Sequence, residues 1–248
     1  MNPEGVTTTM LGRIIAAGVI AMSVMSVSAF TASADDEAST IPGEFSANVG
    51  LFTDYRFRGI SQSDREPAIQ GGFDWAHDSG IYLGTWASNV DFNDAHIEMD
   101  FYGGYANSVG AFSYDLGLIY YWYPGTRRNQ NFDFVEVALG VGYDFEVAAV
   151  SASANYSPDN FGSSGDALYL EGGVDIPLPY ELSLGATLGY QIIEDEATFG
   201  VPDYLTWSIG LSRSFFGFDF GLAYVDTDEG SCGNGCDATV IFSVTRSF

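Results

Sequence analysis

From Phe45 onward, apolar residues alternate with polar or small residues in stretches of about ten, separated by turn-forming residues. In residues 135–143, valine, leucine and tyrosine occupy the odd positions, and glutamate, alanine and glycine occupy the even positions. Because successive side chains of a strand point to opposite faces, this pattern predicts strands with one apolar and one polar face. Helical periodicity is nearly absent, so the chain is predicted to be all-β.

The alternation predicts twelve strands. The first spans Phe45 to Arg58, and the others span 67–77, 80–90, 95–106, 110–122, 132–143, 145–156, 166–176, 179–191, 203–213, 215–226 and 238–248. An even number of strands returns the chain to the side on which it began. Strand content well above half is unusual for a soluble domain but expected in a closed transmembrane barrel.

The connections between these stretches alternate between short and long. The short ones are expected at 77–80, 107–110, 143–146, 176–179 and 213–217, and the long ones at 59–67, 90–95, 123–131, 157–166, 193–203 and 226–237. Bacterial outer-membrane barrels have short periplasmic turns and longer outer loops. The order found here therefore places both termini of the barrel on the periplasmic side.

A soluble β-sandwich is the main alternative, because its strands also alternate. Here the apolar positions recur in nearly every strand and end in aromatic residues, as in YYWYPG (120–125), whereas the other positions are rich in Gly, Ser, Asp and Glu. This pattern suits lipid outside and a polar interior. We therefore predict a transmembrane antiparallel up-and-down β-barrel in the cell outer membrane of a Gram-negative type of cell.

The first 34 residues have the features of an export signal. An apolar run follows Arg13, and Ala32-Ser33-Ala34 fits a small-x-small cleavage site. A retained membrane anchor is the alternative, because the run is nearly long enough to span a bilayer. The expected organisation is a signal peptide at 1–34, a periplasmic segment at 35–44 and the barrel at 45–248.

Two cysteines, Cys232 and Cys236, are separated by Gly-Asn-Gly in a polar segment. An exported chain meets an oxidising compartment, and the glycines allow a tight turn, so a local disulfide is expected. A metal site would need more ligands than two thiols, and no histidine is close in sequence. We therefore expect no metal and no cofactor.

The chain ends in ATVIFSVTRSF, with Val240, Phe242, Val244 and Phe248 on one parity. This ending resembles the C-terminal recognition signal of outer-membrane barrels, although Arg246 stands where an apolar residue is commoner. It predicts that the strand ending in Phe248 is recognised by the barrel-assembly machinery. The acidic outer loops could also bridge to lipopolysaccharide through divalent cations.

Three stretches resemble the TorF family of proteobacterial porin-like proteins. They are FSANVGLFTDYRFRGISQSDREPAIQGGFDW (45–75), GIYLGTWASNVDF (80–92) and EMDFYGGYA (98–106), and TDYRFRGISQSD is the most specific part. The resemblance extends over essentially all of 45–248. It implies an outer-membrane barrel with a pore role, but it supplies no substrate and no catalytic residues.

The chain carries 33 acidic and 8 basic residues, none of them lysine, and its net charge is -25. Such acidity argues against nucleic-acid binding. The polar parity places a mostly acidic set of side chains in the lumen: Asp54, Arg56, Arg58, Asp74, Glu98, Asp100, Asp115, Glu136, Glu171, Asp175, Glu181 and Asp219. A twelve-stranded barrel is narrower than the open porins. These features favour a narrow, cation-preferring channel for passive diffusion of small solutes or ions.

Arg56 and Arg58 are expected on one face of the first strand, about 7 Å apart and facing carboxylates across the lumen. They either form an internal salt-bridge cluster or create a transverse field that selects ions. We take eight residues as candidates for the pore lining or constriction: Asp54, Arg56, Arg58, Asp74, Glu98, Asp100, Glu136 and Glu171.

Two other functions stay open at this stage. A plugged structural or adhesive barrel would result if the loop YPGTRRNQN, with Arg127 and Arg128, folds into the lumen. A lipid hydrolase would need a general base, for which only His77 and His96 are available, and no nucleophile motif accompanies either. We therefore do not expect an enzyme.

Overall fold

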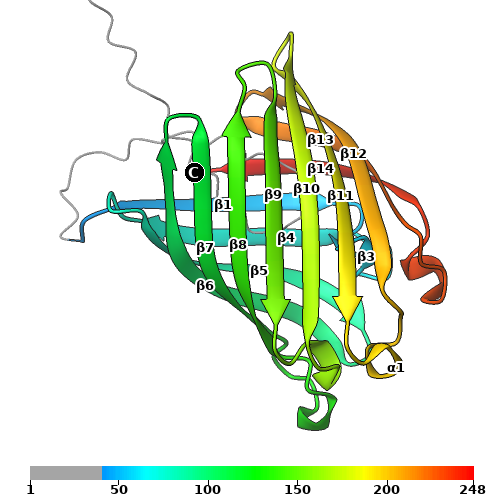
Figure 1. Ribbon diagram of the computed structural model, residues 1–248. Helices are drawn as coiled ribbons and strands as arrows, with labels where there is room; N and C mark the ends of the chain where they lie inside the picture. Colours follow the sequence, from blue (N-terminus) through cyan, green and yellow to red (C-terminus); the bar gives the residue numbers. More distant parts are fainter. Residues whose placement is uncertain (1–40) are drawn as a thin grey trace, which may run out of the picture.

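The computed structural model describes residues 41–248, which form a closed antiparallel β-barrel of twelve strands (Figure 1). The predicted signal peptide and residues 35–40 lie outside the described residues. The barrel strands are β1 (Glu44–Phe52), β4 (Ala68–Ala76), β5 (Ile81–Phe92), β6 (Ala95–Val109), β7 (Phe112–Trp122), β8 (Phe134–Asp144), β9 (Ala149–Ser157), β10 (Ala167–Leu178), β11 (Leu182–Ile193), β12 (Tyr204–Phe215), β13 (Phe218–Thr227) and β14 (Thr239–Ser247). The predicted fold class and strand number are confirmed.

Each strand pairs with its neighbours in sequence, and β1 pairs with both β4 and β14 to close the barrel. At the seam, the backbone N–H of Phe248 donates to Ala47 O at 2.8 Å, and the Ala47 N–H donates to Phe248 O at 3.1 Å. Closure leaves no strand edge unpaired, which is how a barrel satisfies its backbone without water.

The barrel has two unlike ends (Figure 1). We call the end with β1's start, β14's end and the short connections 77–80, 110–111, 145–148, 179–181 and 216–217 the turn end. The opposite, loop end carries the longer connections 53–67, 123–133, 158–166, 194–203 and 228–238. These include the short helices η1 (Arg128–Gln130), η2 (Phe161–Ser163), α1 (Glu196–Phe199) and η3 (Gly233–Gly235). Within residues 41–248, no helix is long and apolar enough to cross a bilayer.

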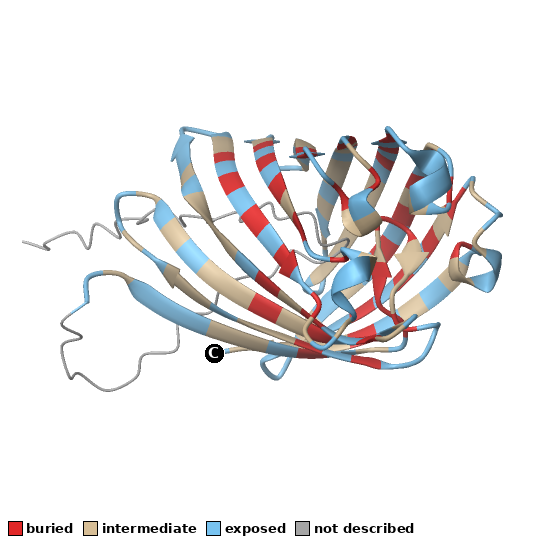
Figure 2. Ribbon diagram, turned by 90° about the horizontal axis from the view of Figure 1, so that it is seen from below, coloured by how far each residue is buried: buried red, intermediate tan, exposed pale blue. Residues whose placement is uncertain are grey.

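The two faces of the wall differ as the alternation predicts. Large apolar side chains such as Phe73, Leu83 and Leu139 point outward and are about half exposed (51%, 57% and 52%). Inward positions carry small and polar residues together with large ones such as Trp86, Tyr121 and Phe134, and those toward the loop end are buried. In Figure 2, the buried residues concentrate in the half of the barrel that carries the helices of the loop end. The lumen is therefore filled at that end.

Several predicted boundaries differ from the observed ones, and two of these differences lie at the loop end. The first strand ends at Phe52 rather than at Arg58, because pairing with β4 and β14 stops there and Arg58 has a left-handed φ of 48° that a strand does not accommodate. Four of the six residues in the predicted long connection at 90–95 belong to strands. Asn93 and Asp94 alone join β5 to β6, and Asn93 supplies the positive φ (51°) typical of a tight hairpin.

Candidate lumen constriction

Residues 53–67, which we call the inward loop, connect β1 to β4 and fold into the loop end of the lumen. The loop contains a small hairpin made of β2 (Arg56–Phe57) and β3 (Ile60–Ser61). Although it is a connection, its side chains at Tyr55, Arg58 and Ser63 are almost fully buried. Such burial requires that the barrel wall surround the loop.

Asp54 organises the inward loop internally. Its carboxylate accepts hydrogen bonds from Ser61 Oγ at 2.6 Å and Ser63 Oγ at 3.2 Å, and it pairs with Arg56 Nε at 2.6 Å. The Ser63 hydroxyl oxygen also accepts from the backbone N–H of Tyr55. Asp54 therefore holds the two arms of the hairpin together and does not line the barrel wall.

Arg58, at the tip of the hairpin, reaches the opposite wall. Its Nη2 donates to Glu136 Oε2 on β8 at 2.7 Å, and its Nη1 donates to Gln191 Oε1 on β11 at 3.0 Å. The guanidinium carbon lies 4.4 Å from the ring centre of Tyr169 on β10 and 4.6 Å from that of Phe57. Burial is the largest influence on Arg58 and lowers its pKa, but Glu136 and the nearby tyrosines together raise the pKa above its usual value, so the guanidinium stays charged.

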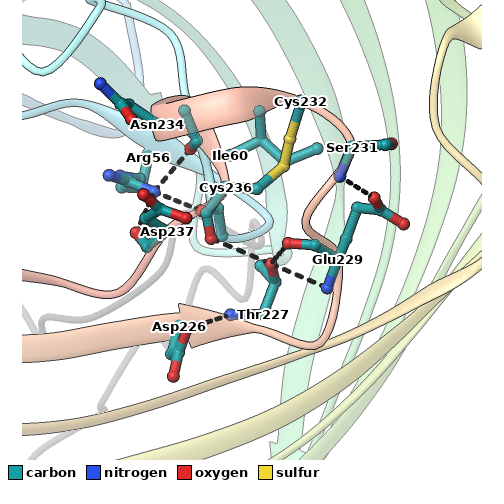
Figure 3. Close-up of a disulfide and its surroundings, with 12 residues drawn as sticks. Arg56, Ile60, Asp226, Thr227, Glu229, Ser231, Cys232, Asn234, Cys236 and Asp237 are labelled. Carbon is teal, nitrogen blue, oxygen red and sulfur yellow. Dashed lines mark hydrogen bonds between the residues drawn. A yellow bond between two sulfur atoms is a disulfide. The ribbon is translucent and has the colours of Figure 1, made fainter.

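Arg56 points the other way, toward the connection 228–238. Its Nη1 donates to the carbonyl oxygens of Gly59 (2.9 Å), Gly235 (2.7 Å) and Asp237 (3.2 Å). The last two carbonyls flank Cys236, which forms a disulfide with Cys232 across the single turn η3 (Figure 3). The disulfide thus fixes the turn whose carbonyl oxygens, those of Gly235 and Asp237, accept hydrogen bonds from Arg56. The prediction that Arg56 and Arg58 share one face is wrong, because the hairpin turns between them.

The inward loop also contacts the wall formed by β5 and β6. Tyr55 donates to Glu98 Oε1 at 2.8 Å and packs edge-on against Trp86, with ring centres 5.4 Å apart. Burial and the nearby Glu98 raise the pKa of Tyr55 well above its usual value, so the hydroxyl remains a donor. On the far side, a Cβ on Gly59 would lie 2.5 Å from Thr206 Oγ1 on β12. The loop therefore spans the lumen from one side to the other.

Tyrosine hydroxyls donate hydrogen bonds to five inward carboxylates of the wall. The pairs are Tyr55 with Glu98 (2.8 Å), Tyr82 with Asp115 (2.8 Å), Tyr102 with Asp74 (2.5 Å), Tyr121 with Glu136 (3.1 Å) and Tyr169 with Glu171 (2.8 Å). A tyrosine positions a carboxylate without cancelling its charge. The tyrosines therefore add no positive charge to the wall, and Glu136 is the carboxylate of this set that pairs with an arginine.

Glycines make room for these tyrosine rings. A Cβ on Gly104 would lie 2.6 Å from the hydroxyl oxygen of Tyr82, and a Cβ on Gly84 would overlap the ring of Tyr102. From the sequence, these glycines are interpreted only as small residues on the polar face. The tyrosine–carboxylate pairs could have been predicted from tyrosines at inward positions of a strand whose neighbouring strand carries a glycine.

The candidate residues fall into two groups. Five lie on the inner face of the barrel strands: Asp74, Glu98, Asp100, Glu136 and Glu171. The other three, Asp54, Arg56 and Arg58, belong to the inward loop. Glu181, expected in the lumen, lies exposed in the turn 179–181 with φ 59°. Tyr169 and Gln191, which contact Arg58, were not anticipated.

The loop 123–133 does not supply the plug. Arg127 and Arg128 are exposed, and Arg127 Nε pairs with Asp94 at 2.9 Å at the loop end. Phe132 anchors this loop by stacking on Phe161, with ring centres 4.4 Å apart. The segment that fills the lumen is therefore the inward loop.

The two histidines lie apart. His77 is in the turn 77–80 at the turn end, where its Nδ1 lies 2.8 Å from Ser79 Oγ. His96 is exposed near the start of β6, at the loop end. They do not form a common site.

Residues 36–248 match the family described as "Bacterial protein of unknown function (Gcw_chp)". The chain belongs to this family. No curated protein matches the sequence.

The barrel is similar to solved porin structures. A structure described as "KdgM porin" superposes with a TM-score of 0.57 at 10% identity, covering 82% of this chain and 99% of that one. A structure described as "NanC porin structure in rhombohedral crystal form" gives 0.55 at 8% identity, covering 82% and 98%. At such identities the likeness concerns the fold, which is the closed twelve-stranded barrel.

Proposed function

We propose that this protein is a porin-like channel of the outer membrane, narrow and cation-preferring, for passive diffusion of small solutes or ions. The observation that carries the proposal is a closed barrel whose apolar side chains face outward while its inner wall holds carboxylates positioned by tyrosines. Ionised carboxylates along a lumen attract cations and repel anions.

The outer surface supports a membrane location. The outward apolar side chains recur in all the barrel strands, and such an extended apolar surface is rare on soluble monomers. Near the loop end, outward tyrosines donate to aspartates at the rim: Tyr120 to Asp133, Tyr156 to Asp166 and Tyr224 to Asp226. Amphipathic aromatic rings of this kind mark the boundary of the apolar layer in outer-membrane barrels.

The charge of the lumen favours a solute unlike that of the similar porin. A further KdgM structure, with a TM-score of 0.56 at 10% identity, is described as a complex with disordered oligogalacturonate, an acidic saccharide. Here the inner wall carries Asp74, Glu98, Asp100, Asp115 and Glu136, and among the described residues the salt bridge to this set comes from Arg58 of the inward loop. An acidic saccharide would be repelled by this wall, so cations or neutral solutes are the expected cargo.

The burial of the inward loop favours a second candidate, a plugged barrel without transport. Glu136, Gln191 and Tyr169 are each at most 2% exposed beneath Arg58, so water does not reach them in this conformation. A loop that can leave the lumen would open the channel, whereas one that stays in place would leave a structural or adhesive barrel.

Conductance separates the two candidates. The refolded protein is inserted into a planar bilayer under a salt gradient, and step size and reversal potential are recorded. Discrete steps with a cation-selective reversal potential support the channel. The absence of conductance steps from folded, inserted protein contradicts the channel and supports the plugged barrel.

Export, assembly and lipid contact belong to the same proposal. The predicted signal peptide would deliver the chain to the periplasm, and the strand ending at Phe248 would present its C-terminal residues to the barrel-assembly machinery. In the closed barrel, Phe248 is 52% exposed, and Arg246 lies 5.2 Å from its ring centre. The acidic loop end would face lipopolysaccharide.

A further inference from the structure

The guanidinium of Arg58 occupies a built binding site in the barrel wall. Glu136 and Gln191 each accept one hydrogen bond from it, from Nη2 and Nη1 respectively, and the rings of Tyr169 and Phe57 cover its plane. Three of these four residues belong to the wall, from β8, β10 and β11. Only Phe57 leaves with the inward loop.

The wall part of this site is held in place without Arg58. Tyr121 on β7 and Asn155 on β9 both donate to Glu136 Oε2, at 3.1 and 3.3 Å. Tyr169 is fixed by its bond to Glu171, and its hydroxyl end lies over Gly189, where a side chain would collide with it. Displacement of the inward loop would therefore leave a preformed pocket rather than a collapsed wall.

The pocket has acceptor capacity that Arg58 does not use. Glu136 Oε1 and Asp100 Oδ1 are buried and have no hydrogen-bond partner among the described residues. Arg58 Nε is likewise buried without a partner within residues 41–248. Unpartnered buried polar groups are costly, and a guanidinium that is not tethered to the inward loop can orient its donors toward these oxygens. The site thus accepts a planar cation with several N–H donors.

We propose that Glu136, Gln191 and Tyr169 form a binding site for solutes that carry a guanidinium group, and that Arg58 of the inward loop occupies this site as an internal competitor. The inference rests on the proposed channel, because the solute reaches the site through the lumen. Binding of a guanidinium solute displaces Arg58 and with it the inward loop, which opens the constriction. The channel is then opened by the same class of solute that its wall binds.

The geometry favours guanidinium over a metal ion or a simple ammonium. No group of three or more His, Cys, Asp or Glu side chains within residues 41–248 is placed to hold a metal ion. Two acceptors on separate strands contact two different nitrogens of one planar group, and an aromatic face lies against that plane. A planar fork satisfies this arrangement, whereas an ammonium presents its donors from a single point.

Binding is tested by titrating the refolded, detergent-solubilised protein with ethylguanidinium and with ethylurea, which has nearly the same shape but no charge. Arg58→Ala removes the competitor, and we expect it to bind ethylguanidinium about tenfold more tightly than the wild type, because binding no longer requires displacement of Arg58. Ethylurea should bind neither protein measurably. Circular dichroism and heat-dependent gel migration verify that each variant is folded, and Arg58→Gln replaces Arg58→Ala if the latter does not fold.

A matched pair of second substitutions locates the site. In the Arg58→Ala background, Glu136→Gln should abolish binding, whereas Asp219→Asn, which removes an inward carboxylate near the turn end, should not. Equal affinity of wild type and Arg58→Ala, or equal losses with both second substitutions, overturns the proposal. Conductance distinguishes failure of the binding-site proposal from failure of the channel proposal. Cation-selective steps without ethylguanidinium binding support the channel and contradict the binding site. Binding without steps from either protein supports the binding site and contradicts the channel.

Discussion

Arg58 and Glu136 are 78 residues apart in sequence, and their side chains meet inside the barrel at 2.7 Å with 3% and 1% of their surface exposed. The pair joins the tip of the inward loop to the wall near the loop end, where β8 begins. A salt bridge in this position fixes the loop in the lumen, because loss of either partner leaves the other charge buried and uncompensated.

A double-mutant cycle measures this coupling. Arg58→Ala should lower the free energy of unfolding by about 3 kcal/mol, because it strands a buried carboxylate. Adding Glu136→Gln should recover part of the loss, since the stranded charge is gone. The measurement is urea unfolding in lipid vesicles followed by tryptophan fluorescence.

The exposed pair Arg127–Asp94 provides the control for this cycle. The Arg127 side chain is 72% exposed, so Arg127→Ala should cost less than about 1 kcal/mol. Equal losses at Arg58 and Arg127, or strict additivity of the two substitutions at 58 and 136, would contradict the role of the buried pair.

Charge selectivity should depend on carboxylates and not on the tyrosines that hold them. Asp74 accepts a hydrogen bond from Tyr102 at 2.5 Å and is only half-buried, so it faces the open part of the lumen. Asp74→Asn should move the reversal potential toward zero in a salt gradient, whereas Tyr102→Phe should leave its sign and most of its size. If Tyr102→Phe has the larger effect, the pairs serve packing rather than selectivity.

The sequence predicted the fold because a barrel repeats one pattern twelve times, and errors in single strands do not change the pattern. It did not predict the end of the first strand. Tyr55 and Phe57 continue the odd-numbered apolar positions of Phe45, Val49 and Leu51, yet they pack inside the lumen rather than facing outward. Alternation records which residues avoid water, and it does not distinguish a lipid-facing position from the core of an inward loop.

The candidate site was predicted in part for a related reason. Parity placed Glu98, Asp100 and Glu136 on the inner face, because each follows from its own strand. The partners of Glu136 depend on contacts across the lumen, with Arg58 on a loop and Gln191 three strands away. A one-dimensional pattern carries no information about which side chains meet across a closed barrel.

Gly59 sets how deeply the inward loop can seat. It has φ +85°, and a Cβ there would collide with Thr206 and Thr227 on the wall. Gly59→Ala should therefore loosen the loop and increase the open probability of the channel. Gly125→Ala is the matched control, because Gly125 has φ +92° and nothing within 4 Å of a Cβ. Both substitutions share a backbone cost of about 1 kcal/mol, so only the collision distinguishes them. Identical gating in the two variants would contradict the seating role.

The disulfide should stabilise the inward loop through Arg56. Replacement of Cys232 and Cys236 by serine removes a crosslink over a short loop, worth about 2 kcal/mol in the unfolded-state model. It also frees the carbonyls of Gly235 and Asp237 that Arg56 contacts. We expect the serine variant to show a higher open probability in bilayers and faster proteolysis within residues 53–67.

Reduction tests the same relationship without substitution. Dithiothreitol should reproduce the effect in the wild type and have none in the serine variant. Arg56→Ala should add little to the serine variant, because both changes disrupt one contact, although Arg56 also binds Asp54 and Gly59 within its own loop. Additive effects on open probability would mean that the disulfide and Arg56 act independently. The contact of Arg56 with the carbonyl oxygens of Gly235 and Asp237 would then have no part in holding the inward loop.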